Sequence, residues 1–141
     1  MLAEIGTDMS RFPTPGHLAS WAGLCPGNNE SAGKRLSGKT TKGNKWLRSA
    51  LVMAARGLRR TKGYLMSQYK RLAARRGRMR AQVAVAHSIL NAIWHMLAHN
   101  VAYADLGEDY FDRRDSEKLT KRLVKRLKGL GHEVTLQPQV A

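Results

Sequence analysis

The sequence predicts an all-α fold: a small multi-helix domain with a Gly/Lys-rich loop insertion and a basic amphipathic helix near the C-terminus. Apolar residues recur every three or four positions over several segments, which is the spacing that buries one face of a helix. Capping residues and glycines stand at the borders of these segments, where helices begin and end. Only residues 134–136, Val-Thr-Leu, have the composition of a strand, so no substantial sheet is expected.

The first expected helices are short. Residues 2–5 are predicted to form a helical turn that Gly6 stops. Thr14 and Pro15 suit the N-cap and the first position of a second helix, which ends at Gly23. Residues 25–44 contain four glycines, a proline and three asparagines, which favours a loop or an irregular hairpin over a helix.

The later helices carry the expected core. Asn44 is a plausible N-cap for one helix, and Gly63 and Gly77 bracket the next. The strongest apolar stripe then follows, and it predicts a central core helix. Its members are Met79, Val83, Ala86, Leu90, Ile93, Leu97 and Val101. Residues 106–111 are predicted to form a turn, and a basic amphipathic helix is expected from Ser116 to Gly131. We therefore predict a domain over residues 1–111, with the basic loop at 25–44, and a helix and tail over 112–141.

The charge distribution predicts a nucleic-acid partner. The chain has 25 Lys and Arg against 10 Asp and Glu, a formal net charge of +15. No acidic residue lies between Glu30 and Asp105, although ordinary solvated surfaces mix both signs. Such a continuous positive field suits a polyanion, and a solvated basic face is the alternative. No apolar run approaches the length of a membrane-spanning helix, and the single cysteine, Cys25, suits a reducing compartment. We expect a soluble cytoplasmic, nucleoid-associated protein with no membrane partner.

Two motifs that suggest other chemistry are weaker. Residues 33–40 match the phosphate-loop pattern GxxxxGK[ST], but no apolar strand precedes them and no helix follows at once, so nucleotide binding is a minor alternative. His95 and His99 are four residues apart on a helix, yet no nearby acid supplies a third metal ligand. We therefore predict no metal site and no cofactor in this chain. Trp21, Trp46 and Trp94 are expected in the core, with base stacking as an alternative for Trp46.

The basic loop offers a candidate nucleophile. A serine hydroxyl becomes useful when cations hold a phosphate beside it, and Ser31 is followed closely by basic residues. From the residues alone, a turn serine in a phosphate-binding loop is the more ordinary interpretation. The candidate nucleic-acid-binding residues are Lys34, Arg35, Lys39, Lys42, Lys45 and Arg48.

Three short motifs in this region resemble a known family. They are Leu-Ala-x-Trp-Ala-Gly-Leu-x-Pro at 18–26, Glu-Ser-Ala-Gly-Lys at 30–34, and Gly-Asn-x-x-Leu-Arg-x-x-Leu at 43–51. Together with the Ala-Val-Ala-His segment at 84–87 and Tyr110-Phe111, their order and spacing are similar to the C-terminal transposase domain of the IS110, IS116 and IS902 insertion-sequence family.

The resemblance implies a recombinase with two halves. An N-terminal RuvC-like half carries four acidic residues that bind a divalent metal, and the C-terminal half carries a serine that attacks DNA under the direction of a structured guide RNA. The family's serine corresponds to Ser31 here. The acidic half is not found in this sequence, so we expect a truncated chain that binds DNA or RNA but recombines DNA only with the missing half, as a homo-oligomer. The alternative is a plain nucleic-acid-binding module in which Ser31 has no chemical role.

Overall fold

The computed structural model describes residues 1–27 and 29–137, and it confirms the all-α class. The chain divides into two compact units, Met1–Glu108 and Asp109–Ala141. The predicted boundary between residues 111 and 112 falls within a short helix, α6 (Tyr110–Arg114). The structure therefore begins a helix inside the segment, 106–111, that was expected to be a turn.

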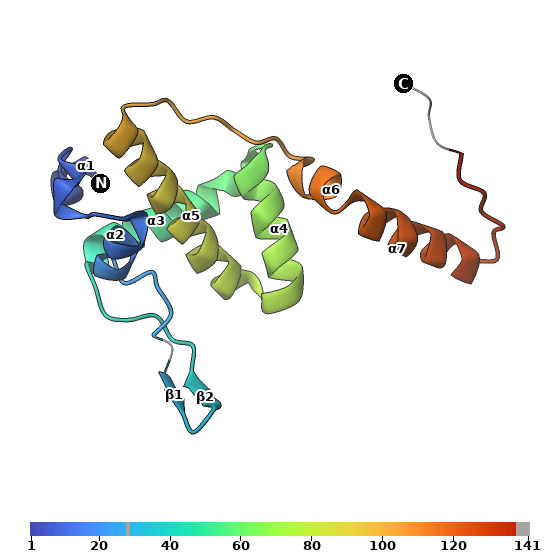
Figure 1. The fold of residues 1–141 in the computed structure, drawn as a ribbon, viewed down its shortest axis with the longest axis horizontal. Helices are drawn as coiled ribbons and strands as arrows, with labels where there is room; N and C mark the ends of the chain where they lie inside the picture. Colours follow the sequence, from blue (N-terminus) through green and yellow to red (C-terminus); the bar gives the residue numbers. More distant parts are fainter. Residues whose placement is uncertain (28, 138–141) are drawn as a thin grey trace. The chain divides into compact units, whose positions relative to one another are not determined.

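The first unit is built from helices and one hairpin (Figure 1). In chain order its elements are α1 (Leu2–Ile5), η1 (Met9–Arg11), α2 (Pro15–Trp21), β1 (Asn29–Ser31), β2 (Lys34–Ser37), α3 (Lys45–Gly57), η2 (Leu58–Arg60), α4 (Tyr64–Arg76) and α5 (Arg78–His99). α5 packs against α2, α3 and α4, so it is the central helix, as the long apolar stripe predicts. The expected caps are also present: Thr14 Oγ1 accepts the His17 N–H, and Asn44 Oδ1 accepts the N–H groups of Trp46 and Leu47.

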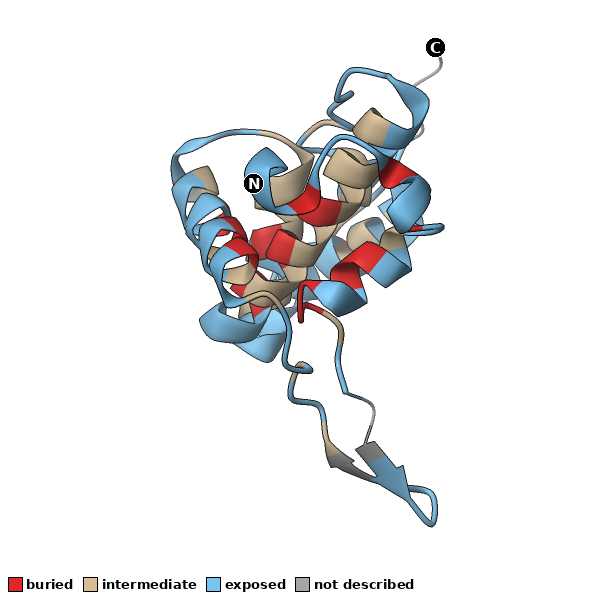
Figure 2. Cartoon of the chain, turned by 90° about the vertical axis from the view of Figure 1, so that its left-hand side faces the viewer, coloured by how far each residue is buried: buried red, intermediate tan, exposed pale blue. Residues whose placement is uncertain are grey.

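The core of the first unit lies between these helices (Figure 2). Its fully buried side chains include Ile5, Leu18, Leu47, Leu51, Val85 and Leu90. The indole N–H of Trp94 donates to the carbonyl oxygen of Phe12 over 2.8 Å, which ties α5 to the segment after η1. Phe12 packs on Trp21, with ring centroids 5.5 Å apart. Met79 and Val101 stand at the two ends of the predicted stripe and are exposed, so the buried part of the stripe is its middle.

The Gly/Lys-rich segment forms an antiparallel hairpin, the more ordered of the two expected alternatives. Ser31 pairs with Lys34 and Glu30 pairs with Arg35, while a bulge separates Glu30 from Asn29. The two-residue turn is Ala32-Gly33, with φ of 49° and 73°. Positive φ at both turn residues gives the backbone a twist that matches the right-handed twist of the two flanking strands. Alanine adopts a positive φ less readily than glycine does. The strand expected at 134–136 is not formed, because these residues have no partner strand in the described part of the chain.

The base of the hairpin is fixed by a close approach of two backbone segments. A Cβ on Gly43 would lie 2.3 Å from the backbone nitrogen of Gly23, closer than real Cβ atoms come to any neighbour. Beside this contact, the Asn44 N–H donates to the Trp21 carbonyl oxygen over 3.2 Å. The Asn44 side chain also donates to Glu4 Oε2 over 2.6 Å, which connects the start of α3 to α1. Glycine is required here because any side chain would force the two segments apart.

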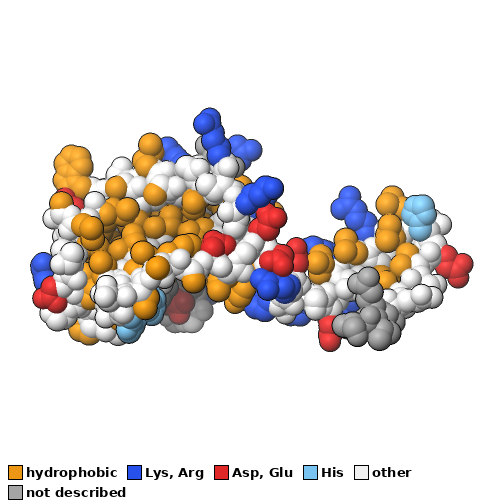
Figure 3. Space-filling model, turned by 90° about the horizontal axis from the view of Figure 1, so that it is seen from above, with side chains coloured by type: hydrophobic (Ala, Val, Ile, Leu, Met, Phe, Trp, Pro, Cys, Tyr) orange, Lys and Arg blue, Asp and Glu red, His pale blue; other side chains and the backbone are white. Residues whose placement is uncertain are grey.

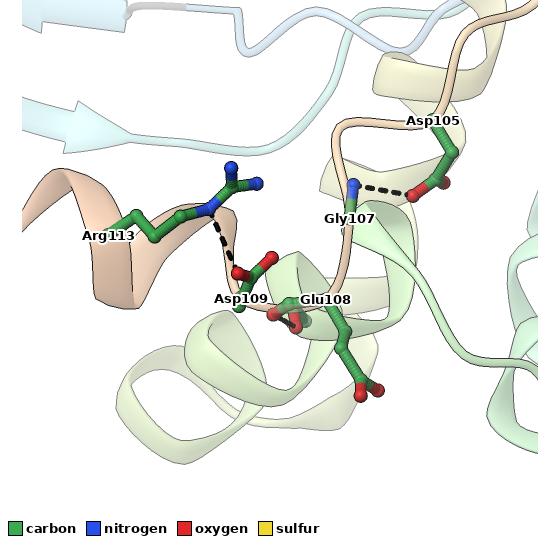
Figure 4. A network of polar contacts seen from close by, with 6 residues as sticks. Asp105, Gly107, Glu108, Asp109 and Arg113 are labelled. Atoms are coloured by element: carbon green, nitrogen blue, oxygen red, sulfur yellow. Dashed lines mark hydrogen bonds and ion pairs between the residues drawn. The ribbon is translucent and has the colours of Figure 1, made fainter. Parts of the chain in front are cut away.

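Asp105 holds the segment after α5 against the start of α4. Its carboxylate accepts the Tyr64 N–H over 3.1 Å and the Gly107 N–H over 2.7 Å, the second of which is drawn in Figure 4. These two backbone hydrogen bonds favour the charged form, so they lower the pKa of Asp105. Asp105, the first acidic residue after the acid-free stretch, thus accepts a hydrogen bond from a backbone N–H group at the start of α4 that has no partner within the helix.

The second unit contains α6 and α7 (Ser116–Gly129). Asp109 forms an ion pair with Arg113 at 2.9 Å, a spacing of i, i+4 along the chain (Figure 4). Basic and apolar side chains both reach the surface of this unit, whereas apolar side chains gather on the face of the first unit that Figure 3 shows. α7 begins at Ser116 as predicted and ends two residues before Gly131.

The Gly23–Gly43 contact predicts a large effect of a single methyl group. Gly43→Ala should lower the free energy of unfolding by about 3 kcal/mol, because the new Cβ collides with backbone that cannot move aside. Gly57→Ala is the matched control, since Gly57 lies in α3 and a Cβ there meets nothing within 4 Å. That control should be neutral or stabilising by up to about 1 kcal/mol. Urea denaturation followed by circular dichroism compares the two, and equal stabilities would contradict the contact.

Candidate nucleic-acid interface

The candidate residues lie along one structural feature, the hairpin and the helix start that follows it. The hairpin extends away from the helices of the first unit (Figures 1 and 2). Outside the two strands it is closed by a bridge between Pro26 and Thr40 and by a hydrogen bond from the Gly27 N–H to the Lys39 carbonyl oxygen, 2.8 Å long. We call this feature the basic hairpin and define it as residues 25–44.

Ser31 stands at the tip of the basic hairpin. It is the last residue of β1, and its side chain is exposed. Ser31 and Lys34 are directly opposite each other in the register, so their side chains share one face of the hairpin. Within the described residues, the Ser31 hydroxyl has no hydrogen bond to a histidine or a carboxylate. The geometry thus provides a cation beside the hydroxyl, and any base that activates it must come from elsewhere.

The six candidate cations are not gathered around the serine. Lys34 is at the tip, Lys39 and Lys42 lie on the returning arm, and Lys45 and Arg48 lie in the first turn of α3. Arg35 belongs to β2, but its side chain lies outside the described part of the structure. The four lysines are exposed and Arg48 is half-buried. The cations therefore follow an extended track from the tip to the base of the hairpin, which suits a long anion better than a single phosphate.

The start of α3 adds to this track. Its first N–H groups are partly satisfied by the Asn44 cap, and the positive end of the helix dipole lies beside Lys45. Trp46, in the same turn, is 68% exposed, which corrects the prediction that it belongs to the core. Trp21 is 40% exposed, so the core prediction is wrong for this residue too, whereas Trp94 packs against the core. The Lys45 ammonium lies 5.0 Å from the Trp46 ring centroid, so one ring face is next to a cation.

Trp46 occupies an apolar position of the predicted helix. The apolar spacing alone does not show whether the indole ring at such a position is buried or exposed. The useful signal was its place in the first turn, directly after a glycine-rich segment. At that place no preceding helical turn exists to cover the ring.

The phosphate-loop pattern at residues 33–40 does not have the geometry of a nucleotide-binding loop. Such a loop joins the end of a strand to the start of a helix. Here Gly33 is a turn residue and residues 34–37 are themselves the strand β2. The segment thus folds back along β1 as a hairpin strand and does not form the strand-to-helix loop that cradles a phosphate.

Neither the histidines nor the cysteine form a second reactive centre. His95 and His99 stack with ring centroids 5.7 Å apart, and Trp94 meets both rings edge-on. Over residues 1–27 and 29–137, no three His, Cys, Asp or Glu side chains are placed to hold a metal ion. The resemblance places its divalent metal in the RuvC-like half, and the described residues of this chain offer no cluster that would hold it. Burial raises the pKa of the Cys25 thiol, which disfavours the nucleophilic thiolate.

No helix among the described residues combines the length and the apolar composition needed to cross a membrane.

The basic hairpin lies within the part of the chain that matches a known protein family. A family model described as the Transposase IS116/IS110/IS902 family matches residues 1–71. The match runs from α1 into α4, so it contains Ser31 and the six candidate cations. No curated protein and no solved structure matches the chain. Because the family model covers 71 of the 141 residues, the chain belongs to the Transposase IS116/IS110/IS902 family.

Proposed function

We propose that this chain is the nucleic-acid-binding part of a transposase and that the basic hairpin is its contact surface. The observation that carries the proposal is the track of cations from Lys34 to Arg48, built within a stretch of 74 residues, 31–104, that contains no acid. An exposed positive track of this kind neutralises phosphates along a backbone and releases their counterions. The ligand is DNA or the structured guide RNA that the resemblance implies.

Ser31 is the proposed nucleophile of the intact transposase. Its hydroxyl oxygen attacks a backbone phosphorus, so that an Oγ–P bond forms as a bond from phosphorus to a sugar oxygen breaks. The serine proton is passed on to the leaving sugar oxygen, and no water is consumed. Lys34, on the same hairpin face, offsets the added charge of the phosphorane-like transition state. The metal-dependent chemistry belongs to a RuvC-like half, with which this chain would act as a homo-oligomer.

A second candidate function is a binding module in which Ser31 has no chemical role. The absence of a hydrogen-bonded base at Ser31, among the described residues, favours it over a self-sufficient nuclease. Both functions predict the same binding and differ only in the chemistry of Ser31, so separate experiments test the binding and the chemistry.

Binding through the basic hairpin predicts a specific salt dependence. If the six candidate cations neutralise six phosphates, they contribute about −5 to the slope of log affinity for a duplex against log salt. Replacing Lys34, Lys39 and Lys42 by Gln should make the slope shallower by about 2.7, since each contact contributes about 0.9. A matched control replaces three exposed cations of α4 and α5, Lys70, Arg75 and Arg78, by Gln. Filter binding over a salt series gives each slope, and equal slopes for the two variants would exclude the hairpin as the main contact.

If Ser31 is the nucleophile, replacing it should abolish the reaction with DNA but leave the affinity for DNA almost unchanged. Ser31→Ala should leave affinity for DNA within about twofold, because a neutral hydroxyl contributes little to a phosphate contact. The same variant should abolish the covalent protein–DNA adduct formed when the chain is combined with a RuvC-like half. Ser49→Ala, an exposed serine on α3, serves as the control and should retain the adduct. A denaturing gel with labelled DNA detects the adduct, and an adduct formed by Ser31→Ala would leave the binding module as the function.

The exposed Trp46 ring predicts preference for an unpaired base beside the hairpin. Stacking on an aromatic side chain contributes about 1–3 kcal/mol per base, so Trp46→Ala should weaken binding to a single-stranded oligonucleotide roughly 5- to 150-fold. Binding should also quench tryptophan fluorescence in the wild type and in Trp21→Phe, but not in Trp46→Phe. Quenching that survives in Trp46→Phe would show that this ring does not stack on the ligand.

A further inference from the structure

One face of α7 carries a second concentration of positive charge. Six cations lie between residues 118 and 128 of the second unit, and all are exposed. They are Lys118, Lys121, Arg122, Lys125, Arg126 and Lys128, and we call them the α7 basic face. At 3.6 residues per turn they fall within an arc of about 160°, opposite the leucines of the same helix. The family match ends at residue 71, so it assigns nothing to this helix.

The α7 basic face is not neutralised within its own unit. Among the described residues of the second unit, Asp109 pairs with Arg113 and Asp115 pairs with Arg114, in or beside α6. Glu117 is the one acid within α7, and it lies in the first turn. Over the described part of this unit, none of the six cations forms an ion pair with an acid. Their charge is therefore available to a ligand.

The spacing of these cations destabilises α7 when no ligand is bound. Lys118 and Arg122, Lys121 and Lys125, and Arg122 and Arg126 are like charges at i, i+4. Each such pair destabilises a helix by about 0.2–0.5 kcal/mol. An ordinary solvated face relieves this repulsion with interspersed Glu, which α7 lacks after residue 117. A bound polyanion removes the repulsion and stabilises the helix at the same time.

We propose that the α7 basic face is a second nucleic-acid-binding surface, which contacts the backbone of duplex DNA independently of the basic hairpin. The cations from Lys118 to Lys128 extend over about 15 Å of helix axis, and duplex DNA carries about nine charges over the same length. The inference relies on the proposed function only for the class of ligand, since a transposase acts on DNA. Two separate contacts on one chain raise its overall affinity by increasing the effective concentration of the second contact.

An anionic membrane is the other polyanion that a basic amphipathic helix can bind. Helices that lie on membranes insert a broad apolar face that commonly includes Trp or Phe. The apolar stripe of α7 contains leucine and one valine only, with Leu123 and Leu127 half-exposed. The basic arc is wider than this stripe and faces away from it. The composition thus favours a ligand that meets the cations and not the leucines.

The test uses the full chain and a 20-base-pair duplex over a salt series. Replacing Lys121, Arg122 and Lys125 by Gln should make the slope of log affinity against log salt shallower by about 2.7. The charge-retaining variant with Lys121→Arg and Lys125→Arg should keep the wild-type slope, and circular dichroism checks the helix in both. Combining the α7 triple variant with the hairpin triple variant should give additive changes in slope.

The outcomes separate the two contacts. A shallower slope in the α7 variant with no change in the hairpin variant would support the α7 basic face and contradict the basic hairpin as the contact. An unchanged slope in the α7 variant overturns the α7 proposal, whatever the hairpin variant does. Flotation with vesicles containing phosphatidylserine identifies the alternative: vesicle binding by the wild type that the α7 variant loses, with the DNA slope unchanged, would assign the face to a membrane.

Discussion

The backbone contact between Gly23 and Gly43 is the constraint on which the rest of the first unit depends. It joins the end of α2 to the residue before the α3 cap, so the chain leaves the helical body and returns to it at one point. Asn44 completes this junction through Trp21 and Glu4. Because the junction fixes both ends of the hairpin and the direction of α3, the cations at its base and along its returning arm are held in one continuous track.

The acidic and the basic side chains of the protein have different structural roles. Asp105 accepts backbone N–H groups at the start of α4, and Asp109 and Asp115 pair with arginines in or next to α6. These three carboxylates are thus engaged within their own units. The lysines of the basic hairpin and of α7 are left exposed. In the free protein, repulsion among these exposed cations destabilises the fold. Binding of a polyanion removes this repulsion.

The helices were predictable because their signals are local. Apolar spacing located the core face of α5, and Thr14 and Asn44 marked two helix starts that the structure confirms. The hairpin was predicted only as an alternative, because Lys, Ser and Gly give no strand pattern and the turn uses alanine at positive φ. The Gly23–Gly43 contact depends on how α2 meets α3, which no local pattern encodes. The exposure of Trp46 was missed because its apolar helical position was weighed above its place in the first turn of α3. The chemical role proposed for Ser31 follows only from the family resemblance.

The most direct test of the central claim is a titration of the ¹⁵N-labelled chain with a short duplex, followed by the amide resonances. Binding through the basic hairpin should shift the amides of residues 29–37 and of the first turn of α3, while the buried middle of α5, around Val85 and Leu90, stays in place. Shifts confined to α4 and α5, with the hairpin amides unchanged, would contradict the account.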